Sequence, residues 1–307
     1  MRDAFIARLS ELAGTDARIV LITGDLGFGV LNEFERKFPE QFLNVGVAEQ
    51  NMTAVATGLA LEGRIVFTYS IGNFPILRCL EQLRNDACYH EANVKVVSVG
   101  GGFSYGQLGM SHHATEDLSI ARAIPGLTVC VPGTALEARN AVDAVVSTEG
   151  AAYLRLERAP GEVVDDPNVP FALGRARVLR EGTDLTLIGS GGIISEIGKA
   201  ADELERHGIR CRLLSMHTLK PFDVQSVVKA AGETGGILTV EENTILGGLG
   251  GAVAEVCLEQ QNRPKRFRRL GIGDRFVSIV GDQGYLRKHV EIDAASIAAM
   301  AQEMLRS

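Results

Sequence analysis

The sequence contains no stretch of apolar residues that approaches the ~20 needed for a membrane-spanning helix, although 46% of its 307 residues are hydrophobic. The opening Met1-Arg2-Asp3 leads into a helical pattern and lacks the basic and apolar regions of a signal peptide. We therefore expect a cytoplasmic protein with no membrane partner. A chain of this length and hydrophobic content can bury sizeable cores and is expected to form two domains.

Cysteine and basic charge are also limited. The five cysteines show no C-x-x-C spacing, which indicates neither a disulfide framework nor a zinc site, and we expect reduced thiols, most of them in the core. The formal net charge is −7 and the positions of Lys and Arg predict no basic stripe, so a nucleic-acid surface is disfavoured. The glycine patterns of nucleotide-binding loops are missing between strand and helix. Small molecules are the expected ligands.

Short β-branched runs alternate with helical patterns along the chain, which predicts α/β layers on parallel strands. Strands are expected at 19–23, 65–69, 94–99, 127–131, 185–188, 211–214 and 237–240, with helices at 5–12, from 52, at 77–88, 134–147, 194–206 and 294–305. The alternation stops at Ala159-Pro160-Gly161 and polar residues follow. We expect a linker over residues 161–174, between a domain of residues 1–160 and one of residues 175–307.

The segment Val45-Gly46-Val47-Ala48-Glu49-Gln50-Asn51-Met52 places a carboxylate between an apolar run and a helix. On its own, Glu49 would be interpreted as a helix-start carboxylate favoured by the dipole. The string VGVAEQNM, however, resembles the cofactor-activating segment of the transketolase family. The resemblance implies that Glu49 is catalytic: it hydrogen-bonds N1′ of the pyrimidine ring of thiamine diphosphate, favours the imino tautomer and so promotes loss of the thiazolium C2 proton.

Three other residues match family positions around the pyrimidine. Phe74 follows a strand at the carboxyl edge of the predicted sheet, where ligands bind in open α/β sheets, and matches the aromatic that stacks on the ring. Its loop is one residue longer than in some relatives, so Tyr69 is an alternative for the stacking contact. Asp25, after the first strand, resembles another position near the pyrimidine, and an ordinary turn aspartate is an equal alternative.

Substrate-binding positions are matched in the same way. His112, in a glycine-rich stretch, matches the catalytic histidine that contacts the donor's carbonyl and hydroxyl oxygens, a task that suits imidazole near neutral pH. A metal on His112 and His113 is disfavoured, because adjacent residues rarely direct both rings to one ion. Arg2 and Arg158 match positions that bind the substrate's terminal phosphate, which guanidinium groups recognise well.

The sequence also departs from the family pattern. Leu108 stands where many transketolases carry an aspartate that reads a substrate hydroxyl, Gly100 replaces a histidine of the phosphate pocket, and Gly29 replaces a serine. These departures put the usual pentose phosphates in doubt as substrates. The segments 70–75 and 84–86 are most similar to split enzymes for less common sugars, the apulose 4-phosphate type among them.

The family's diphosphate site is missing from the sequence. Thiamine diphosphate enzymes hold Mg²⁺ through a GDG motif and a downstream Asn, which supply oxygen ligands, but 24–26, 273–275 and 281–283 all break the triplet. Residues 240–243 and 247–251 resemble the family's C-terminal domain. The resemblance thus implies two three-layer α/β/α domains: a parallel-sheet pyrimidine-binding domain and a mixed-sheet C-terminal domain. It also implies a separate alpha subunit that carries the diphosphate and Mg²⁺ ligands, in an alpha2beta2 heterotetramer.

The implied reaction cleaves a ketose between C2 and C3 and transfers the two-carbon ketol unit to an aldehyde, with sugar phosphates as the expected substrates. Two alternatives use the same cofactor: a carboligase similar to 1-deoxyxylulose-5-phosphate synthase, and the beta subunit of a 2-oxo acid dehydrogenase. A third alternative is a non-catalytic assembly subunit that kept the fold. Release of CO₂ from pyruvate would favour the first two, and a Glu49 substitution without effect would favour the third.

Overall fold

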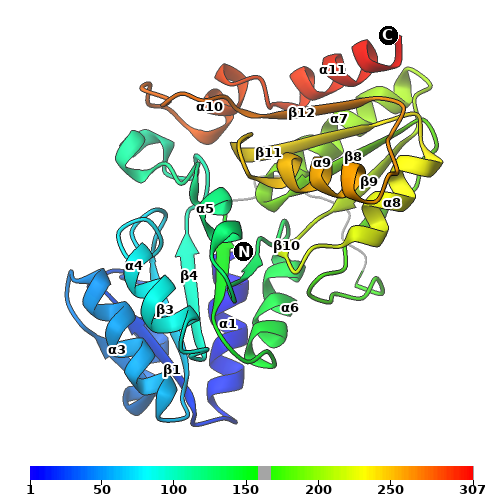
Figure 1. The fold of residues 1–307 in the computed structure, drawn as a ribbon. Coiled ribbons are helices and arrows are strands. Elements are labelled where there is room, and N and C mark those ends of the chain that lie inside the picture. The colour runs from blue at the N-terminus through cyan, green and yellow to red at the C-terminus, as the bar shows by residue number, and fades with distance from the viewer. Residues whose placement is uncertain (158–166, 307) are drawn as a thin grey trace.

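The computed structural model describes residues 1–157 and 167–306, which form two α/β lobes joined side by side (Figure 1). The first lobe is built on a seven-stranded sheet in the order β10-β5-β6-β4-β3-β1-β2. Its strands are β1 (Ile19–Thr23), β2 (Phe42–Asn44), β3 (Ile65–Ile71), β4 (Val94–Val99), β5 (Thr128–Cys130), β6 (Ala152–Leu156) and β10 (Thr218–Lys220). Its helices are α1 (Arg2–Ala13), α2 (Asn32–Lys37), α3 (Glu49–Leu61), α4 (Leu80–Gln82), which continues as a wider helical turn over Leu83–Cys88, α5 (Asp117–Ala123) and α6 (Ala135–Val146).

The second lobe is built on a five-stranded sheet in the order β12-β11-β8-β9-β7, in which β7 runs antiparallel to β9 and the other pairs are parallel. Its strands are β7 (Arg177–Arg180), β8 (Leu185–Ser190), β9 (Cys211–Ser215), β11 (Ile237–Thr244) and β12 (Phe267–Ile272). Its helices are α7 (Ile194–Arg206), α8 (Val224–Glu233), α9 (Leu249–Glu259), α10 (Gln283–His289) and α11 (Ala294–Arg306). The prediction of two α/β domains, the second with a mixed sheet, is confirmed.

The first sheet differs from the predicted one at its edge. Strand β10 belongs to the second half of the sequence, yet it pairs antiparallel with β5, so the sheet is not purely parallel. The pairing covers a strand edge that would otherwise present unpaired backbone groups. One apolar core runs from Val129 and Leu219 in the first lobe to Leu214 in the second. The lobes therefore share buried structure, which the alternation of sequence patterns did not predict.

Helix α6 opens with Thr134 and Glu137, which have the spacing of a capping box. The Thr134 hydroxyl accepts a hydrogen bond from the Glu137 N–H at 3.0 Å, as expected for the start of α6. The Glu137 carboxylate accepts instead from the N–H of Gly133, at 2.7 Å, and lies 3.2 Å from the Arg177 guanidinium of the second lobe. Glu137 is fully buried, so this side chain joins the lobes as well as opening a helix.

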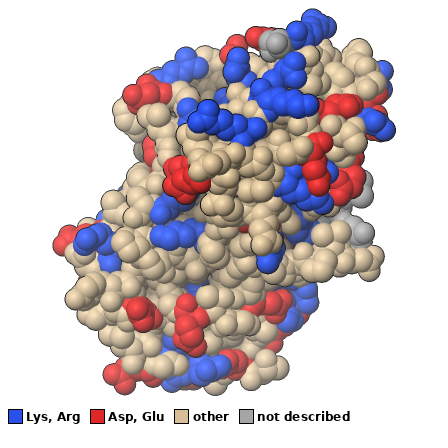
Figure 2. Space-filling model, turned by 45° about the vertical axis from the view of Figure 1, so that its right-hand side comes forward, with Lys and Arg blue, Asp and Glu red and all other residues tan. Residues whose placement is uncertain are grey.

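Two predictions from composition can be compared with the surface and core. All five cysteines lie in the described part of the chain, buried and without a disulfide, as expected. The expectation of no basic stripe is wrong: Figure 2 shows Lys and Arg gathered on the second lobe, and the edge strand β12 and its approach carry Arg263, Lys265, Arg266, Arg268 and Arg269. Charge on an edge strand discourages pairing with another chain.

Among the described helices, none is long and apolar enough to cross a membrane.

Candidate active site

Glu49 begins helix α3 beside the carboxyl end of β1, where its Cγ lies 3.7 Å from the position of a Cβ on Gly24. Its side chain is 3% exposed. Within the described residues, the carboxylate has one side-chain hydrogen-bond partner, Nη1 of Arg78, at 2.8 Å. Burial of a charge is costly unless it is paired. Arg78 therefore supplies the partner that a buried carboxylate at this position requires.

Phe74 lies in the loop that joins β3 to α4, and Arg78 links it to Glu49. The Arg78 guanidinium carbon stands 4.4 Å from the centroid of the Phe74 ring, over its face. The His112 ring meets the edge of Phe74, with centroids 5.3 Å apart and planes at 66°. The structure thus brings together Glu49, Phe74 and His112, three residues far apart in the sequence. Arg78 was missed, because nothing in the sequence distinguishes it from a surface arginine four residues after Phe74.

Tyr69, the alternative to Phe74, lies in the core of the first lobe. It is 3% exposed and its ring is nearly parallel to that of Phe5, with centroids 6.4 Å apart. Burial also raises the pKa of its hydroxyl. Since the ring of Tyr69 is covered by protein and that of Phe74 is only partly buried, the geometry favours Phe74 for a stacking contact with a ligand.

Asp25 lies in a turn, as expected if it is an ordinary turn aspartate. Its φ of 58° lies in the left-handed region, which Asp and Asn tolerate better than most residues. Its backbone N–H donates to the Asn44 side chain at 3.0 Å, and Asn44 donates back to the Asp25 carboxylate at 3.2 Å. Asp25 therefore ties the ends of β1 and β2 together, and a contact with the cofactor stays a prediction.

His112 and His113 face different surroundings. Their loop is closed by two backbone hydrogen bonds between Gly102 and Ala114. His112 is half-buried next to Phe74, and its Nδ1 lies 3.0 Å from the Ser111 hydroxyl. His113 is buried edge-on against Phe103, and burial lowers its pKa. In the described part of the chain no three His, Cys, Asp or Glu side chains are grouped to hold a metal ion.

The glycines that open this loop make room for large side chains. A Cβ on Gly100 would lie 2.0 Å from the Tyr105 ring, one on Gly101 2.1 Å from the Arg155 side chain, and one on Gly102 2.4 Å from a Glu242 carboxylate oxygen. Packing therefore requires glycine at these three positions. Tyr105 covers Gly100, where the family pattern would place a histidine of the phosphate pocket. Sequence reasoning missed Tyr105 because only the folded loop returns it to Gly100.

Arg2 stands at the start of α1, and Figure 1 shows this end of the chain at the junction of the two lobes. Its guanidinium pairs with Asp3 at 2.9 Å, which raises the pKa of Arg2, and the Tyr69 and Tyr105 hydroxyls act on that pKa in the same direction. Arg2 and these two hydroxyls thus form a polar cluster beside Gly100. Arg158, its predicted companion, lies outside the described residues.

Two other departures from the family pattern lie in open positions. Leu108 is 57% exposed and lines a cavity of about 480 Å³ between its own loop and the residues that lead into α10. The N–H of Gly29 donates to the Asn32 side chain at 2.7 Å, and no atom lies within 4 Å of where its Cβ would stand. The cavity beside Leu108 leaves room for a larger group, whereas the φ of 76° at Gly29 disfavours any side chain there in spite of the open space.

The second lobe holds the His112 loop through the end of β11. Glu242 accepts hydrogen bonds from the Phe103 N–H at 2.5 Å and from the Gln283 amide at 2.9 Å, and pairs with Arg287. One residue on, the Asn243 amide donates to the Ser119 hydroxyl at 3.1 Å. The resemblance of residues 240–243 to the C-terminal domain pattern gave no hint of these contacts, because Phe103 and Ser119 lie more than a hundred residues away in the sequence.

A buried charge cluster lies behind the same loop. Arg155 is fully buried, 3.2 Å from the Asp117 carboxylate and 3.1 Å from that of Glu157, and donates to the backbone oxygen of Glu242. Burial raises the pKa of Asp117, and raises that of Glu157 to about 7 although Arg155 opposes the shift. Asp117, in the first turn of α5, also accepts a hydrogen bond from the Tyr153 hydroxyl inside the protein, at 2.7 Å.

The two contacts of Arg78 are of the kind that the pyrimidine half of thiamine diphosphate would need. A guanidinium is flat and donates hydrogen bonds in its plane, and Arg78 already makes a face contact with Phe74 and a hydrogen bond with Glu49. An aminopyrimidine ring can make the same two contacts. The oxygen ligands that would hold Mg²⁺ and a diphosphate are not grouped among the described residues. The site thus fits one half of the cofactor.

Comparisons with known proteins also find a pyrimidine-binding domain and a C-terminal domain in this chain. Residues 1–161 match the model "Transketolase, pyrimidine binding domain" and residues 174–297 match "Transketolase, C-terminal domain". The chain belongs to the transketolase family. It is 38% identical over 305 residues to the 6-deoxy-6-sulfo-D-fructose transketolase subunit SqwH of Clostridium sp. (strain MSTE9), covering 99% of this chain and 94% of that one.

In two further comparisons, the match covers almost the whole of this chain and of the protein compared with it. An apulose-4-phosphate transketolase subunit of Phocaeicola vulgatus is 37% identical, over 99% of this chain and 97% of that protein. A solved structure described as a split gene transketolase, inactive beta4 tetramer, superposes with a TM-score of 0.88 and is 36% identical, covering 99% of this chain and 97% of that one. This transketolase-family chain thus has the length and domain content of a split-gene subunit.

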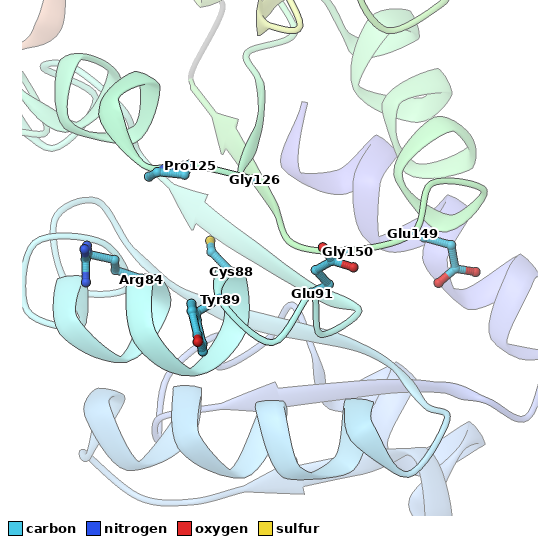
Figure 3. Close-up of a pocket in the computed structure, with 8 residues that line it drawn as sticks. All are labelled: Arg84, Cys88, Tyr89, Glu91, Pro125, Gly126, Glu149 and Gly150. Atoms are coloured by element: carbon cyan, nitrogen blue, oxygen red, sulfur yellow. The ribbon is translucent and has the colours of Figure 1, made fainter.

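A second cavity, of about 580 Å³, lies where β4, β5 and β6 begin, away from Glu49 (Figure 3). Figure 3 shows Arg84 at its rim, on the helical turn that follows α4. Arg84 is exposed and bonds to the Asn85 side chain, so it shares neither partner of Arg78. The cavity is lined by Arg84, Cys88, Tyr89, Glu91, Pro125, Gly126, Glu149 and Gly150.

Proposed function

We propose that this chain is the beta-type subunit of a split, thiamine diphosphate-dependent transketolase that transfers a two-carbon ketol unit between sugars in the cytoplasm. One observation carries the proposal. At the carboxyl edge of the first sheet, Glu49 and Phe74 both contact the flat guanidinium of Arg78, and His112 meets the edge of Phe74. Open α/β sheets bind ligands at this edge. We propose residues 1–160 and 175–307 as its domains and 161–174 as the linker, and the family matches to residues 1–161 and 174–297 support this division.

Thiamine diphosphate, held by Glu49 and Phe74, would supply carbanion chemistry for the transfer of the two-carbon unit. In that complex Glu49 holds a hydrogen bond to the pyrimidine N1′, and Phe74 fixes the plane of the ring. His112, at the edge of Phe74, is placed to contact the donor's oxygens and to move a proton there. Asp25 would contribute from the turn beside the ring, while Tyr69 supports the site from the core.

A partner subunit completes the site in this proposal. The described residues lack a grouped set of oxygen ligands for Mg²⁺, so the ligands of the metal and of the diphosphate belong to a separate alpha subunit. The match to a structure described as an inactive beta4 tetramer supports a beta-type chain that needs a partner for activity. We propose an alpha2beta2 assembly with the active site between the two kinds of subunit.

The substrate is proposed to be a sugar with an anionic end group. Arg2, with the Tyr69 and Tyr105 hydroxyls near it, provides one cationic and two neutral polar groups at the junction of the lobes; Arg158 is proposed as a second cation. The names of two relatives each include an anionic sugar, a sulfonated one and a phosphorylated one. Tyr105 over Gly100 supports a pocket that differs from the usual phosphate pocket.

The test is reconstitution of the purified chain with the product of a neighbouring gene that encodes a GDG motif and a downstream Asn. The isolated chain should bind thiamine diphosphate poorly, and the two-subunit complex should bind it with Mg²⁺ and transfer ketol units between sugars. Tight Mg²⁺-dependent binding by the isolated chain would contradict the split site. Release of CO₂ from pyruvate by the complex would favour instead the carboligase or dehydrogenase alternatives.

A further inference from the structure

Arg78 makes both contacts that the proposed function assigns to the pyrimidine ring. Its Nη1 lies 2.8 Å from Oε2 of Glu49, and its guanidinium carbon lies 4.4 Å from the centroid of Phe74. The first contact corresponds to the hydrogen bond with N1′ and the second to ring stacking. A guanidinium plane and an aromatic ring cannot occupy the same face of Phe74 at the same time.

The two contact residues are fixed and Arg78 is not. Glu49 is held at 3% exposure on α3, and the loop around Phe74 is anchored by a hydrogen bond from Asn73 to the His113 carbonyl and by the Cys79 thiol on the Phe74 carbonyl, at 3.3 Å. The Arg78 side chain is 46% exposed. An arginine side chain has several rotatable bonds, so the guanidinium can leave toward solvent while Glu49 and Phe74 remain in place.

We propose that Arg78 occupies the pyrimidine position in the cofactor-free chain and that thiamine diphosphate binds by displacing it. The inference rests on the proposed function, since it takes Glu49 and Phe74 as the pyrimidine contacts. It goes further by giving the chain an internal competitor for its own cofactor. Arg78 also pairs the buried carboxylate while the site holds no ligand, and so lowers the cost of keeping Glu49 charged inside the protein.

Competition of this kind has a measurable effect on affinity. When the competent conformation is only a fraction of the population, the apparent dissociation constant rises by the inverse of that fraction. An arginine that occupies the site for about nine-tenths of the time would weaken binding about tenfold, or about 1.4 kcal/mol at 25 °C. Removing the guanidinium should therefore tighten the binding of thiamine diphosphate, whereas removing an ordinary binding residue would weaken it.

The experiment is calorimetric titration of thiamine diphosphate, at saturating Mg²⁺, into the reconstituted two-subunit complex. Arg78→Met keeps an unbranched apolar stem without the flat charged head and should bind about tenfold more tightly than wild type. Arg78→Lys keeps the charge without the plane and should fall between the two. The matched control is Arg84→Met, on the same stretch of helix, because Arg84 contacts neither Glu49 nor Phe74; its affinity should equal that of wild type.

A double-mutant cycle isolates the contact with Glu49. If Arg78 competes through Glu49, the gain from Arg78→Met should shrink to less than about threefold in the Glu49→Gln background, because neighbouring residues couple. Circular dichroism of each complex checks that the variants are folded.

Cofactor affinity in Arg78→Met equal to or weaker than that of wild type would overturn the inference and leave the proposed function standing. Unchanged cofactor affinity with a raised KM for the sugar would overturn it in favour of a substrate-binding arginine. Failure of the wild-type complex and all variants to bind the cofactor would overturn the proposed function, and the inference with it.

Discussion

Glu242 accepts a hydrogen bond from the backbone N–H of Phe103, with Oε1 2.5 Å from the nitrogen, and this bond joins the second lobe to the loop that carries His112. The other carboxylate oxygen pairs with Arg287, so both oxygens are used inside the protein. Gly102 has no room for a Cβ because of this carboxylate. The position of His112 is thus set in part by a residue that does not reach the reacting atoms.

Glu242→Ala should lower both stability and turnover. The change leaves buried Arg287 without its nearest partner, since the Glu196 carboxylate lies 3.8 Å away, and breaking a buried ion pair costs about 3–5 kcal/mol. We expect the unfolding free energy from urea titration to fall by about that amount, and kcat to fall more than KM rises because His112 is displaced. Glu242→Gln, which still accepts from Phe103, should restore part of kcat. The control is Glu11→Ala, whose partners Arg8 and Arg139 are partly exposed. Normal kcat in Glu242→Ala would contradict the positioning role.

The buried carboxyl of Glu157 should make stability fall as pH rises through neutrality. Burial raises its pKa from 4.5 to about 7 in the folded protein. Between these values the folded state binds more protons than the unfolded state, so the stabilisation is complete below pH 4.5 and is lost as pH passes 7. The unfolding free energy measured from pH 5 to 8 should decline more steeply in wild type than in Glu157→Gln. Identical slopes would show that Glu157 is ionised throughout.

A matched carboxyl separates this effect from general charge repulsion. Hydrogen bonds from Arg139 and Arg8 lower the pKa of Glu11 from 4.5 to about 2, so its titration lies below the measured range. Glu11→Gln should therefore keep the wild-type slope between pH 5 and 8, although it removes one negative charge as Glu157→Gln does.

Glu49→Gln should abolish cofactor activation in the reconstituted complex while leaving the fold intact. Glutamine fills nearly the same volume, but its neutral amide cannot exchange a proton with N1′ of the pyrimidine. It therefore cannot favour the imino tautomer as a carboxyl group does. General acid-base groups contribute ~10² to 10⁴ in rate, and the loss should reach at least this range. The measurement is deuterium exchange at C2 of bound thiamine diphosphate. Exchange near the wild-type rate would remove Glu49 from the mechanism and would favour the non-catalytic assembly subunit.

Arg2→Ala should raise KM for sugars with an anionic end by about tenfold and leave kcat nearly unchanged. A charged contact remote from the reacting carbons contributes mostly uniform binding, and tenfold corresponds to about 1.4 kcal/mol. Neutral sugars should show no change. Arg18→Ala is the control, since Arg18 lies just beyond the other end of α1 and pairs with Asp16. If wild type uses anionic and neutral sugars with equal kcat/KM, the end-group pocket is wrong.

The sequence alone determined the fold class and the family, and it named most residues of the candidate site. Apolar alternation placed β1, β4 and α7 at the observed residues, because these elements are buried in a regular pattern. Local strings identified Glu49, Phe74 and His112, since each lies in a short segment whose residues are all adjacent in the chain. Such information is local, and a single sequence carries it directly.

Tertiary structure decided which groups meet. Arg78 pairs with Glu49 from 29 residues away, and Glu242 reaches Phe103 across 139 residues. Antiparallel β10 joins the first sheet from the second half of the chain. The sequence leaves Tyr69 as an alternative to Phe74, and only folding shows which ring the core covers. These facts depend on long-range packing and on the burial of charge, which arise when distant segments are brought together and leave no periodic trace in the sequence.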